Sequence, residues 1–243
     1  SVDTARTAVG KATRVAQVVP EAAPFVASLW AALTATERER YQNWVSQNQA
    51  ARPGFRRHAP PGRVACSRFA YAASWFLALL DSKMFPLRRL VQAEAHREPQ
   101  LGPGHLEFDA SPWGGGAVYF LAGKPVSWMK AVWDPEIYNR FQATPGDPAF
   151  QTLWEFFTLL LACELWAPRH AALACCVKGD NTGALQDALR LKGRGSLNHI
   201  AREFAWRRAA YAWELDFVHL PSELNVRADA LSRLHAPLES RKE

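Results

Sequence analysis

Cysteine, long apolar runs and repetitive tracts are all scarce in this chain of 243 residues, and each shortage excludes a class of protein. The four cysteines, at positions 66, 163, 175 and 176, show no Cys-x-x-Cys spacing and no paired histidines, which argues against a zinc site. Two of them, Cys175 and Cys176, are adjacent in an apolar segment, as is typical of buried, reduced thiols. We therefore expect an intracellular protein, of the cytoplasm or the nucleus.

The apolar residues are numerous but nowhere form a membrane-spanning run. The longest apolar stretch, residues 150–167, is interrupted by Gln151, Glu155 and Glu164, so the sequence predicts no membrane span and no membrane partner. The first ten residues contain no apolar core of the length that a signal peptide needs. An apolar content of 49% with 10 Trp supplies a core for one large domain or two small ones.

The net charge of +6 is unevenly distributed along the chain. Residues 1–105 contain 14 Lys or Arg and 7 Asp or Glu, whereas residues 106–243 contain 15 and 16. This division predicts that the basic residues 1–105 bind a polyanionic substrate and that residues 106–243 cleave it. The alternative is that the upstream arginines only solvate a helical surface.

The upstream part has the apolar spacing of helices, and the downstream part alternates strands with helices. Helices are predicted over residues 8–19, ended by Pro20, over residues 24–33, from Thr36 onward, and over residues 63–80, with turn-rich residues 52–62 between the last two. From His105 onward strands are predicted over residues 105–109, 116–121, 124–128, 172–178 and 214–219, and helices over residues 149–166, 181–191, 197–213 and 225–234. This order predicts an α/β domain with a mixed five-stranded sheet and helices on both faces, preceded by a mostly helical segment.

Four acidic residues are distributed over these elements: Asp109, Glu155, Asp180 and Asp229. Asp109 and Asp180 are expected at the carboxyl ends of strands, where open α/β sheets place their ligand sites. Carboxylates gathered from distant segments repel one another unless a cation neutralises them, and oxygen-only ligands suit Mg²⁺. The four acids therefore predict a site for two Mg²⁺ ions, or Mn²⁺ in their place, that cleaves phosphodiesters.

Three of these acids also have a simpler interpretation that stays open on the sequence alone. Glu155 lies among apolar neighbours and could pair with a buried Arg. Asp180 could be the N-cap of the helix that follows it, and Asp229 could only complement the dipole of its own helix. Glu164, half a turn out of phase with Glu155, is expected to be a solvated surface residue.

The segments around these acids resemble a known enzyme family. FDASPWGGGAVYF, TLWEFFTLLLACELW, GDNTGAL and HLPSELNVRADALSRL look like the four motif blocks of the ribonuclease H domain of retroelement reverse transcriptases, and ADALSR is typical of gypsy-like and DIRS-like elements. The resemblance covers roughly residues 105–235. More weakly, residues 9–33 and 63–82 are similar to the thumb and connection that precede this domain.

The resemblance implies a division of the chain and an activity. It implies a thumb- or connection-like segment over residues 1–100, a ribonuclease H-like catalytic domain over 105–236 and a tail over 237–243. It also implies a Mg²⁺-dependent endonuclease that cuts the RNA strand of RNA–DNA hybrids, with Asp109, Glu155, Asp180 and Asp229 as catalytic metal ligands. The expected partners are the hybrid and the polymerase part of the same polyprotein, of which this chain would be a C-terminal piece. Two alternatives are a catalytically inactive nucleic-acid-binding module of this fold and a DNA strand-transfer enzyme.

Six further residues are candidates for substrate contacts. Groups near Ala110, Ser111 and Asn181 are expected near the 2′-hydroxyls of the RNA strand. Lys192 and Arg194, between glycines, are expected to contact phosphates. The sixth candidate is Asn225, which is also the predicted N-cap of the helix that positions Asp229.

Many ribonucleases H have a histidine in a loop before the last catalytic acid. The candidates here, His199 and His219, fall in a predicted helix and at a strand end, so neither matches that loop and both are expected to be structural.

Overall fold

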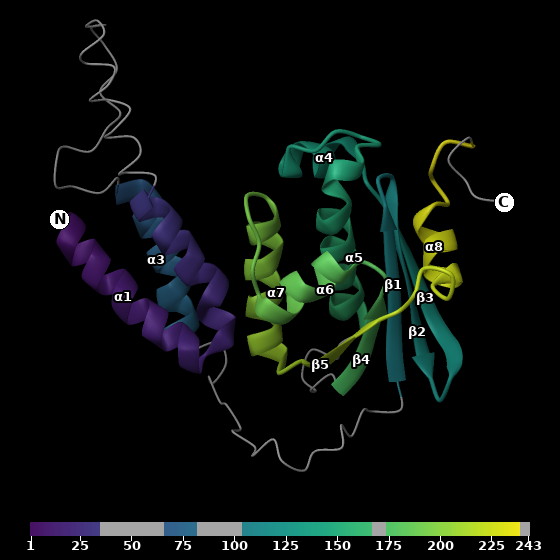
Figure 1. The fold of residues 1–243 in the computed structure, drawn as a ribbon, viewed down its shortest axis with the longest axis horizontal. Coiled ribbons are helices and arrows are strands. Elements are labelled where there is room, and N and C mark those ends of the chain that lie inside the picture. Colours follow the sequence, from purple (N-terminus) through teal and green to yellow (C-terminus); the bar gives the residue numbers. More distant parts are fainter. Residues whose placement is uncertain (35–65, 82–103, 167–173, 239–243) are drawn as a thin grey trace, which may run out of the picture. The chain divides into compact units, whose positions relative to one another are not determined.

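The computed structural model describes residues 1–34, 66–81, 104–166 and 174–238, which belong to two compact units, Ser1–Arg89 and Leu90–Glu243 (Figure 1). The predicted helix from Thr36, the turn-rich residues 52–62 and Pro168 lie outside the described residues. Among the residues described, no helix is both long and apolar enough to cross a membrane.

The described residues of the first unit are helical, as predicted. It contains α1 (Val2–Val18), a short 3-10 helix (Pro20–Ala22), helical residues 23–34 and α3 (Cys66–Asp81). Its core is formed by apolar side chains that the helical spacing brings onto one face of each helix, among them Val9, Phe25 and Leu79. Phe25 stacks on Trp75 with ring centroids 5.9 Å apart, which joins residues 23–34 to α3.

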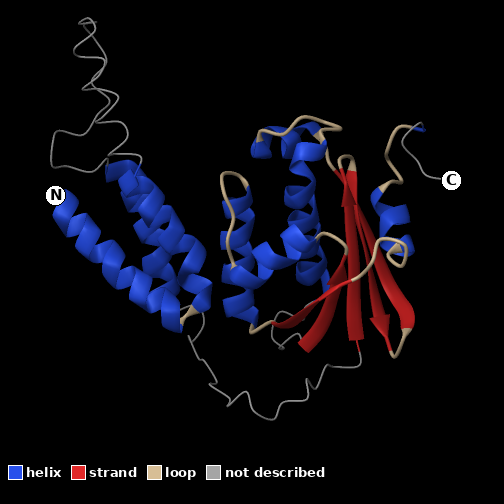
Figure 2. Cartoon of the chain, viewed as in Figure 1, coloured by secondary structure: helices blue, strands red, loops and turns tan. Residues whose placement is uncertain are grey.

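The second unit is built on a five-stranded sheet in the order β3-β2-β1-β4-β5 (Figure 2). The strands are β1 (Gly104–Ser111), β2 (Gly114–Leu121), β3 (Lys124–Val132), β4 (Ala174–Gly179) and β5 (Glu214–His219). β1, β2 and β3 form an antiparallel meander, whereas β4 pairs in parallel with both β1 and β5. The mixed five-stranded sheet predicted from the sequence is therefore confirmed.

The hairpin between β2 and β3 turns at the two residues that the sequence indicates. Ala122 and Gly123 both have positive φ angles, of 49° and 76°, as a two-residue turn of the kind that matches the twist of the strands requires. β1 and β2 each extend further toward their own turn than predicted, because Ala110 and Ser111 pair with Gly115 and Gly114.

The helices of the second unit are α4 (Pro135–Phe141), α5 (Gln151–Trp166), α6 (Thr182–Arg190), α7 (Leu197–Tyr211) and α8 (Val226–Ser232), with a short 3-10 helix (Pro148–Phe150) before α5. α5 and α8 cover opposite faces of the sheet (Figure 1). Two neighbouring glycines of β2 show this directly: a Cβ on Gly115 would meet the side chain of Thr158 in α5, and a Cβ on Gly116 would meet α8.

An aromatic cluster under α5 fixes that helix against the sheet. Trp154, which is fully buried, stacks on Trp133 at 5.1 Å and meets Tyr138 and Phe141 of α4 edge-on. α4 was not predicted from the sequence, although Asp134 caps it and Pro135 occupies its first turn. The cluster places the buried side of α5, including Glu155, against β1 and β2.

Candidate active site

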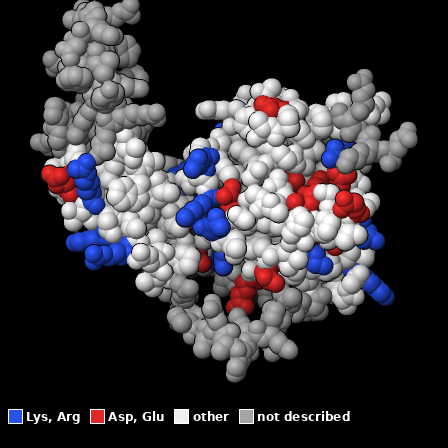
Figure 3. Space-filling model, viewed as in Figure 1, with Lys and Arg blue, Asp and Glu red and all other residues white. Residues whose placement is uncertain are grey.

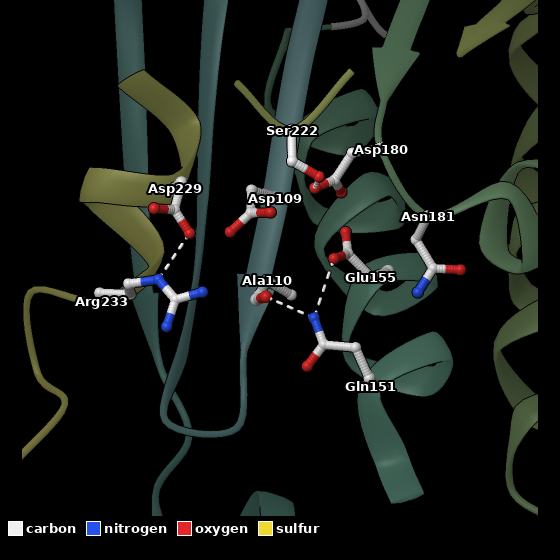
Figure 4. A pocket seen from close by; sticks show the side chains of 9 residues that line it. All are labelled: Asp109, Ala110, Gln151, Glu155, Asp180, Asn181, Ser222, Asp229 and Arg233. Carbon is white, nitrogen blue, oxygen red and sulfur yellow. Dashed lines mark hydrogen bonds and ion pairs between the residues drawn. The ribbon is translucent and has the colours of Figure 1, made fainter. Parts of the chain in front are cut away.

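A pocket of about 280 Å³ lies on the second unit between β1, α5 and α8 (Figure 4). Figure 3 shows acidic side chains gathered over this part of the surface. The pocket is lined by nine residues: Asp109, Ala110, Gln151, Glu155, Asp180, Asn181, Ser222, Asp229 and Arg233. All four acids singled out in the sequence are among them.

Three of these acids form one cluster. Asp109, Glu155 and Asp180 each offer a carboxylate oxygen, and the three oxygens lie within 4.8 Å of one another. Asp109 comes from β1, Glu155 from α5 and Asp180 from the residue that follows β4. Three like charges at this separation repel one another strongly unless protons or a cation neutralise them.

The cluster lies where β1 and β4 part. The two strands pair only from His105 to Glu107 on β1, so Asp109 is beyond the last paired residue on that side. The prediction that Asp109 ends its strand was wrong, because β1 continues to Ser111 through its pairing with β2. The opening beside Asp109 is instead created by the end of β4 at Gly179, immediately before Asp180.

Glu155 is the most deeply buried acid of the cluster, with 1% of its surface exposed. Gln151, one turn earlier in α5, donates from Nε2 to Glu155 Oε1 at 2.9 Å and to the Ala110 carbonyl at 2.6 Å. The other oxygen, Oε2, is buried without a hydrogen-bond partner. Burial, and then the charges of Asp109 and Asp180, raise the pKa of Glu155 well above its ordinary value. The partner is thus Gln151, rather than the buried Arg of the alternative interpretation.

Asp109 is held from the opposite face of the sheet. Its Oδ2 accepts a 2.6 Å hydrogen bond from Ser232 Oγ at the end of α8, and 4% of the residue is exposed. Burial raises the pKa of Asp109 to about 7, and the charges of Asp180 and Asp229 act in the same direction against the hydrogen bond from Ser232. An ordinary aspartate would be fully ionised several pH units lower.

Asp180 is oriented by the loop that follows β5. Ser222 Oγ donates to Asp180 Oδ2 at 2.7 Å. Asp180 is not the N-cap of α6: Asn181 has that role, with its side-chain oxygen accepting from the Ala184 amide at 3.0 Å. The capping interpretation of Asp180 is therefore wrong, and its carboxylate is left to face the pocket (Figure 4).

Asp229 lines the same pocket but lies outside the group of three. Its Oδ1 is paired with Nε of Arg233 at 2.5 Å, and the two residues are one helical turn apart. In Figure 4 this pair lies on α8, on the other side of Asp109 from Glu155 and Asp180. The structure thus brings three of the predicted metal ligands together and pairs the fourth with Arg233, the residue that caps the end of its helix.

The donor set fits a hard divalent cation. The three clustered side chains offer only oxygen atoms, which suit Mg²⁺ or Mn²⁺ and not a thiolate- or imidazole-binding metal. The buried, unpartnered Oε2 of Glu155 is an acceptor that a cation in the cluster would satisfy.

The predicted substrate residues are divided between the pocket, the core and the surface. Ala110 and Asn181 line the pocket. Lys192 and Arg194 are exposed in the turn between α6 and α7 and lie outside the pocket lining. Ser111 is not available to a substrate, since it is buried and its Oγ donates to the Ser232 carbonyl at 2.7 Å.

Asn225 occupies the N-cap position of α8, as predicted, but it is not available to a substrate. It is fully buried, its side chain makes no capping hydrogen bond, and Nδ2 donates to the Phe108 carbonyl at 2.9 Å. The residue therefore anchors the start of α8 to β1 next to Asp109. It positions Asp229 through this contact and does not itself face the pocket.

Other polar residues of the sequence analysis have structural partners. Glu164 is not freely solvated, as it pairs with Arg207 of α7 at 2.5 Å. His199 Nδ1 lies 2.6 Å from a guanidinium nitrogen of Arg202, and burial together with Arg202 and Arg140 lowers its pKa. Neither His199 nor His219 lines the pocket.

The sequence analysis missed the residues that hold the acids. Gln151, Ser232 and Arg233 each bond a neighbouring acid, and Ser222 bonds Asp180 from the loop before α8. The spacing of four residues from Gln151 to Glu155 and from Asp229 to Arg233 was a usable signal, because residues so spaced are neighbours on a helix. Ser222 and Ser232 are far in sequence from the acids they bind and carried no such signal.

Comparison with known proteins gives solved structures only. No family model matches the chain, and no curated protein matches it in sequence. The solved structures include ribonuclease H1 from Halobacterium salinarum (14% identity, 53% of this chain and 91% of that one, TM-score 0.38). They also include the N-terminal ribonuclease H domain of a Mycobacterium tuberculosis protein, solved as a fusion with maltose-binding protein (18% identity, 53% and 88%, TM-score 0.38).

A third similar structure is the foamy viral protease-reverse transcriptase in complex with double-stranded DNA, at 13% identity and a TM-score of 0.30. That similarity covers 78% of this chain and 37% of the viral one. The gypsy-like or DIRS-like subtype stays a prediction. The strand order, the mixed sheet and the helices on both of its faces are those of the ribonuclease H-like fold that the sequence motifs predict.

Proposed function

We propose that this chain is a Mg²⁺-dependent endonuclease that cuts the RNA strand of RNA–DNA hybrids during reverse transcription of a retroelement. The main support for the proposal is that carboxylate oxygens from β1, α5 and the residue after β4 lie within 4.8 Å of one another in a pocket. One carboxylate oxygen of this cluster, Oε2 of Glu155, is buried without a hydrogen-bond partner. A fold gains no stability from such a cluster in the absence of a cation, because burial and mutual repulsion both oppose ionisation.

Asp109, Glu155 and Asp180 would hold one cation, and Asp229 would complete the shell of a second. When bound, Mg²⁺ or Mn²⁺ supplies neutralisation of the scissile phosphate and acidification of an attacking water. The chain itself orients the ligands: Ser232 fixes Asp109, Ser222 fixes Asp180 and Gln151 fixes Glu155. Each of these donors binds one carboxylate oxygen and leaves the other for the cation.

The choice of a hybrid is assigned to polar groups in the pocket. The half-buried Asn181 lies beside the acids, where 2′-hydroxyls of an RNA strand would have to be read, whereas Ala110 lines the pocket but is itself buried. Lys192 and Arg194 are exposed cations that suit phosphates further along the substrate. The polymerase part of the same polyprotein is the proposed partner that delivers the hybrid.

The test is cleavage of a labelled RNA–DNA hybrid, with duplex DNA of the same sequence as a parallel substrate. We expect 5′-phosphorylated RNA fragments that depend on Mg²⁺ or Mn²⁺ and disappear with EDTA. Binding without cleavage would support the inactive nucleic-acid-binding module instead. Cutting of duplex DNA at a comparable rate would support the strand-transfer enzyme.

The strand preference gives a sharper form of this test. Replacing a short run of the RNA strand by deoxynucleotides should block cleavage within that run, because the 2′-hydroxyls identify the strand. Binding of the substituted hybrid should be nearly unchanged, since phosphates dominate the affinity. Equal cutting inside and outside the run would contradict the ribonuclease assignment.

A further inference from the structure

α8 contributes an acid to the pocket, and the residue that caps the end of this helix, Arg233, neutralises that acid. Asp229 and Arg233 are each 26% exposed at the side chain, and both line the pocket that contains the three clustered acids. Among the nine lining residues, four are acidic and Arg233 alone is basic.

The paired acid lies outside the cluster of three. Asp109, Glu155 and Asp180 converge within 4.8 Å, whereas Oδ1 of Asp229 is bonded to Arg233 Nε at 2.5 Å. Asp229 lies in α8, whose position is fixed by Asn225 at its start and by Ser232 at its end, and Arg233 directly follows Ser232. For Asp229 to bind a divalent metal ion, therefore, only the side chains of Asp229 and Arg233 have to move.

We propose that Arg233 is a positioning residue that acts as an internal counter-ion of Asp229, so that the second divalent cation enters only when the Asp229–Arg233 pair opens. This inference rests on the proposed cation site and deepens it. Arg233 competes with the second cation for the same carboxylate, and it thereby raises the cation concentration that the free enzyme needs. A substrate phosphate near the pocket favours opening, because it offers the guanidinium an alternative anionic partner.

The competition is measurable without any cleavage. Mn²⁺ binding to the full chain, free of nucleic acid, would be followed by the electron paramagnetic resonance signal of unbound Mn²⁺. Arg233→Gln should tighten the weaker Mn²⁺ site about two- to fivefold, which corresponds to a partly exposed ion pair worth up to about 1 kcal/mol. Arg233→Lys, which keeps the charge, should stay closer to wild type.

Two further variants separate competition from a general loss of positive charge. Arg227→Gln removes the same charge from an exposed position of α8 outside the pocket lining, and it should leave Mn²⁺ affinity unchanged. In an Asp229→Asn background, Arg233→Gln should have no further effect, because the contested carboxylate is gone. Thermal unfolding of each variant reports whether it is folded.

The outcomes are distinct for the inference and for the proposed function. Equal Mn²⁺ affinity in wild type and in folded Arg233→Gln would overturn the inference while the cation site stands. The same tightening in the Asp229→Asn background, or in Arg227→Gln, would also overturn it. A wild-type chain that binds no Mn²⁺ would overturn both. As a direct readout, the Nε–H resonance of Arg233 should shift on Mg²⁺ titration, and an unmoved resonance at saturation would contradict the opening of the pair.

Discussion

At the scale of single residues, Asp109 is where burial and charge conflict most clearly. Its carboxylate is nearly inaccessible to water, accepts one hydrogen bond from Ser232 and is exposed to the fields of Asp180 and Asp229. The residue is therefore unfavourable for folding and suited to cation binding. The same conflict, deeper in the core, raises the pKa of Glu155.

We expect Asp109→Asn and Asp180→Asn to reduce hybrid cleavage by more than about 100-fold, since even losing a partner of a metal ligand costs about 10–100-fold. Each substitution removes a charge with little change in volume. The fold should persist, and without cations the melting temperature of Asp109→Asn should rise, because a buried repulsive charge is gone. Near-wild-type turnover in either folded variant would contradict the assignment of these acids.

The raised pKa of Asp109 predicts how stability depends on pH without cations. In the unfolded chain Asp109 ionises near pH 4, whereas in the folded protein it keeps its proton up to a pKa of about 7. The folded state therefore binds more protons between these values, and its stability should fall as the pH rises from about 4 to about 7. Urea unfolding at several pH values in EDTA measures this fall.

Asp109→Asn serves as the control for that pH dependence. Its stability should lose the part of the slope that Asp109 contributes, so the difference between the two proteins should grow with pH and level off above about pH 7. Saturating Mg²⁺ should flatten the wild-type curve, since a bound cation favours the ionised acids. A constant difference across the whole range would show that Asp109 does not titrate there.

At the scale of elements, the site depends on how closely α8 approaches the sheet. A Cβ on Gly116 would lie 2.5 Å from the Ala228 carbonyl oxygen and 2.6 Å from the Ser232 amide nitrogen, both of them backbone atoms of α8. Gly116 also pairs with Asp109 across β1 and β2. Gly115 and Gly116 thus allow α5 and α8 to pack closely against the two faces of the sheet.

Gly116→Ala should displace α8, destabilise the second unit by roughly 1–3 kcal/mol and weaken cleavage, because Ser232, Asp229 and Arg233 move with the helix. Gly10→Ala is the matched control, as it adds the same methyl group to an exposed helix position with nothing within 4 Å. That control should be neutral or slightly stabilising. Thermal unfolding and hybrid cleavage of both variants make the comparison, and equal behaviour would contradict the role given to Gly116.

The elements also show what the sequence could predict. The order of the five strands and of four helices in the second unit was predicted correctly, because apolar residues recur there at clear strand and helix spacings. The four acids that line the pocket were singled out because each lies in one of the four sequence motifs. α4 was missed despite the helix-start signal of Asp134 and Pro135. The true end of β1 depends on pairing with Gly114 and Gly115, which is not a local property.

The partners of the acids were the least predictable part of the site. Asp229 and Arg233 have the spacing of a helical ion pair. That spacing alone does not show whether Asp229 pairs with the arginine or binds a metal ion. Ser222 and Ser232 reach Asp180 and Asp109 only through the tertiary fold, from 42 and 123 residues away. Interactions of this range leave no periodic trace in the sequence.

At the scale of the whole molecule, the excess of positive charge lies in residues 1–105. If residues 1–105 bind the hybrid, a chain beginning at Gly102 should bind the hybrid more weakly. The dependence of its log affinity on log salt concentration should also be shallower. Each lost phosphate contact should remove about 0.9 from the slope. Salt titrations of the full and shortened chains, both checked for a folded second unit, measure it. Equal slopes would show that the upstream arginines face solvent.

The pairing of β1 with β4 also determines when the site can form during folding. The hairpins of the meander close over short turns, whereas the pairing of His105 with Cys176 joins positions roughly 70 residues apart, and the entropy lost on closing a loop grows with its length. Long-range pairings of this kind are the slow part of folding. During synthesis, a nascent chain that has passed Val132 but not Asp180 contains all three strands of the meander and still lacks one acid of the cluster.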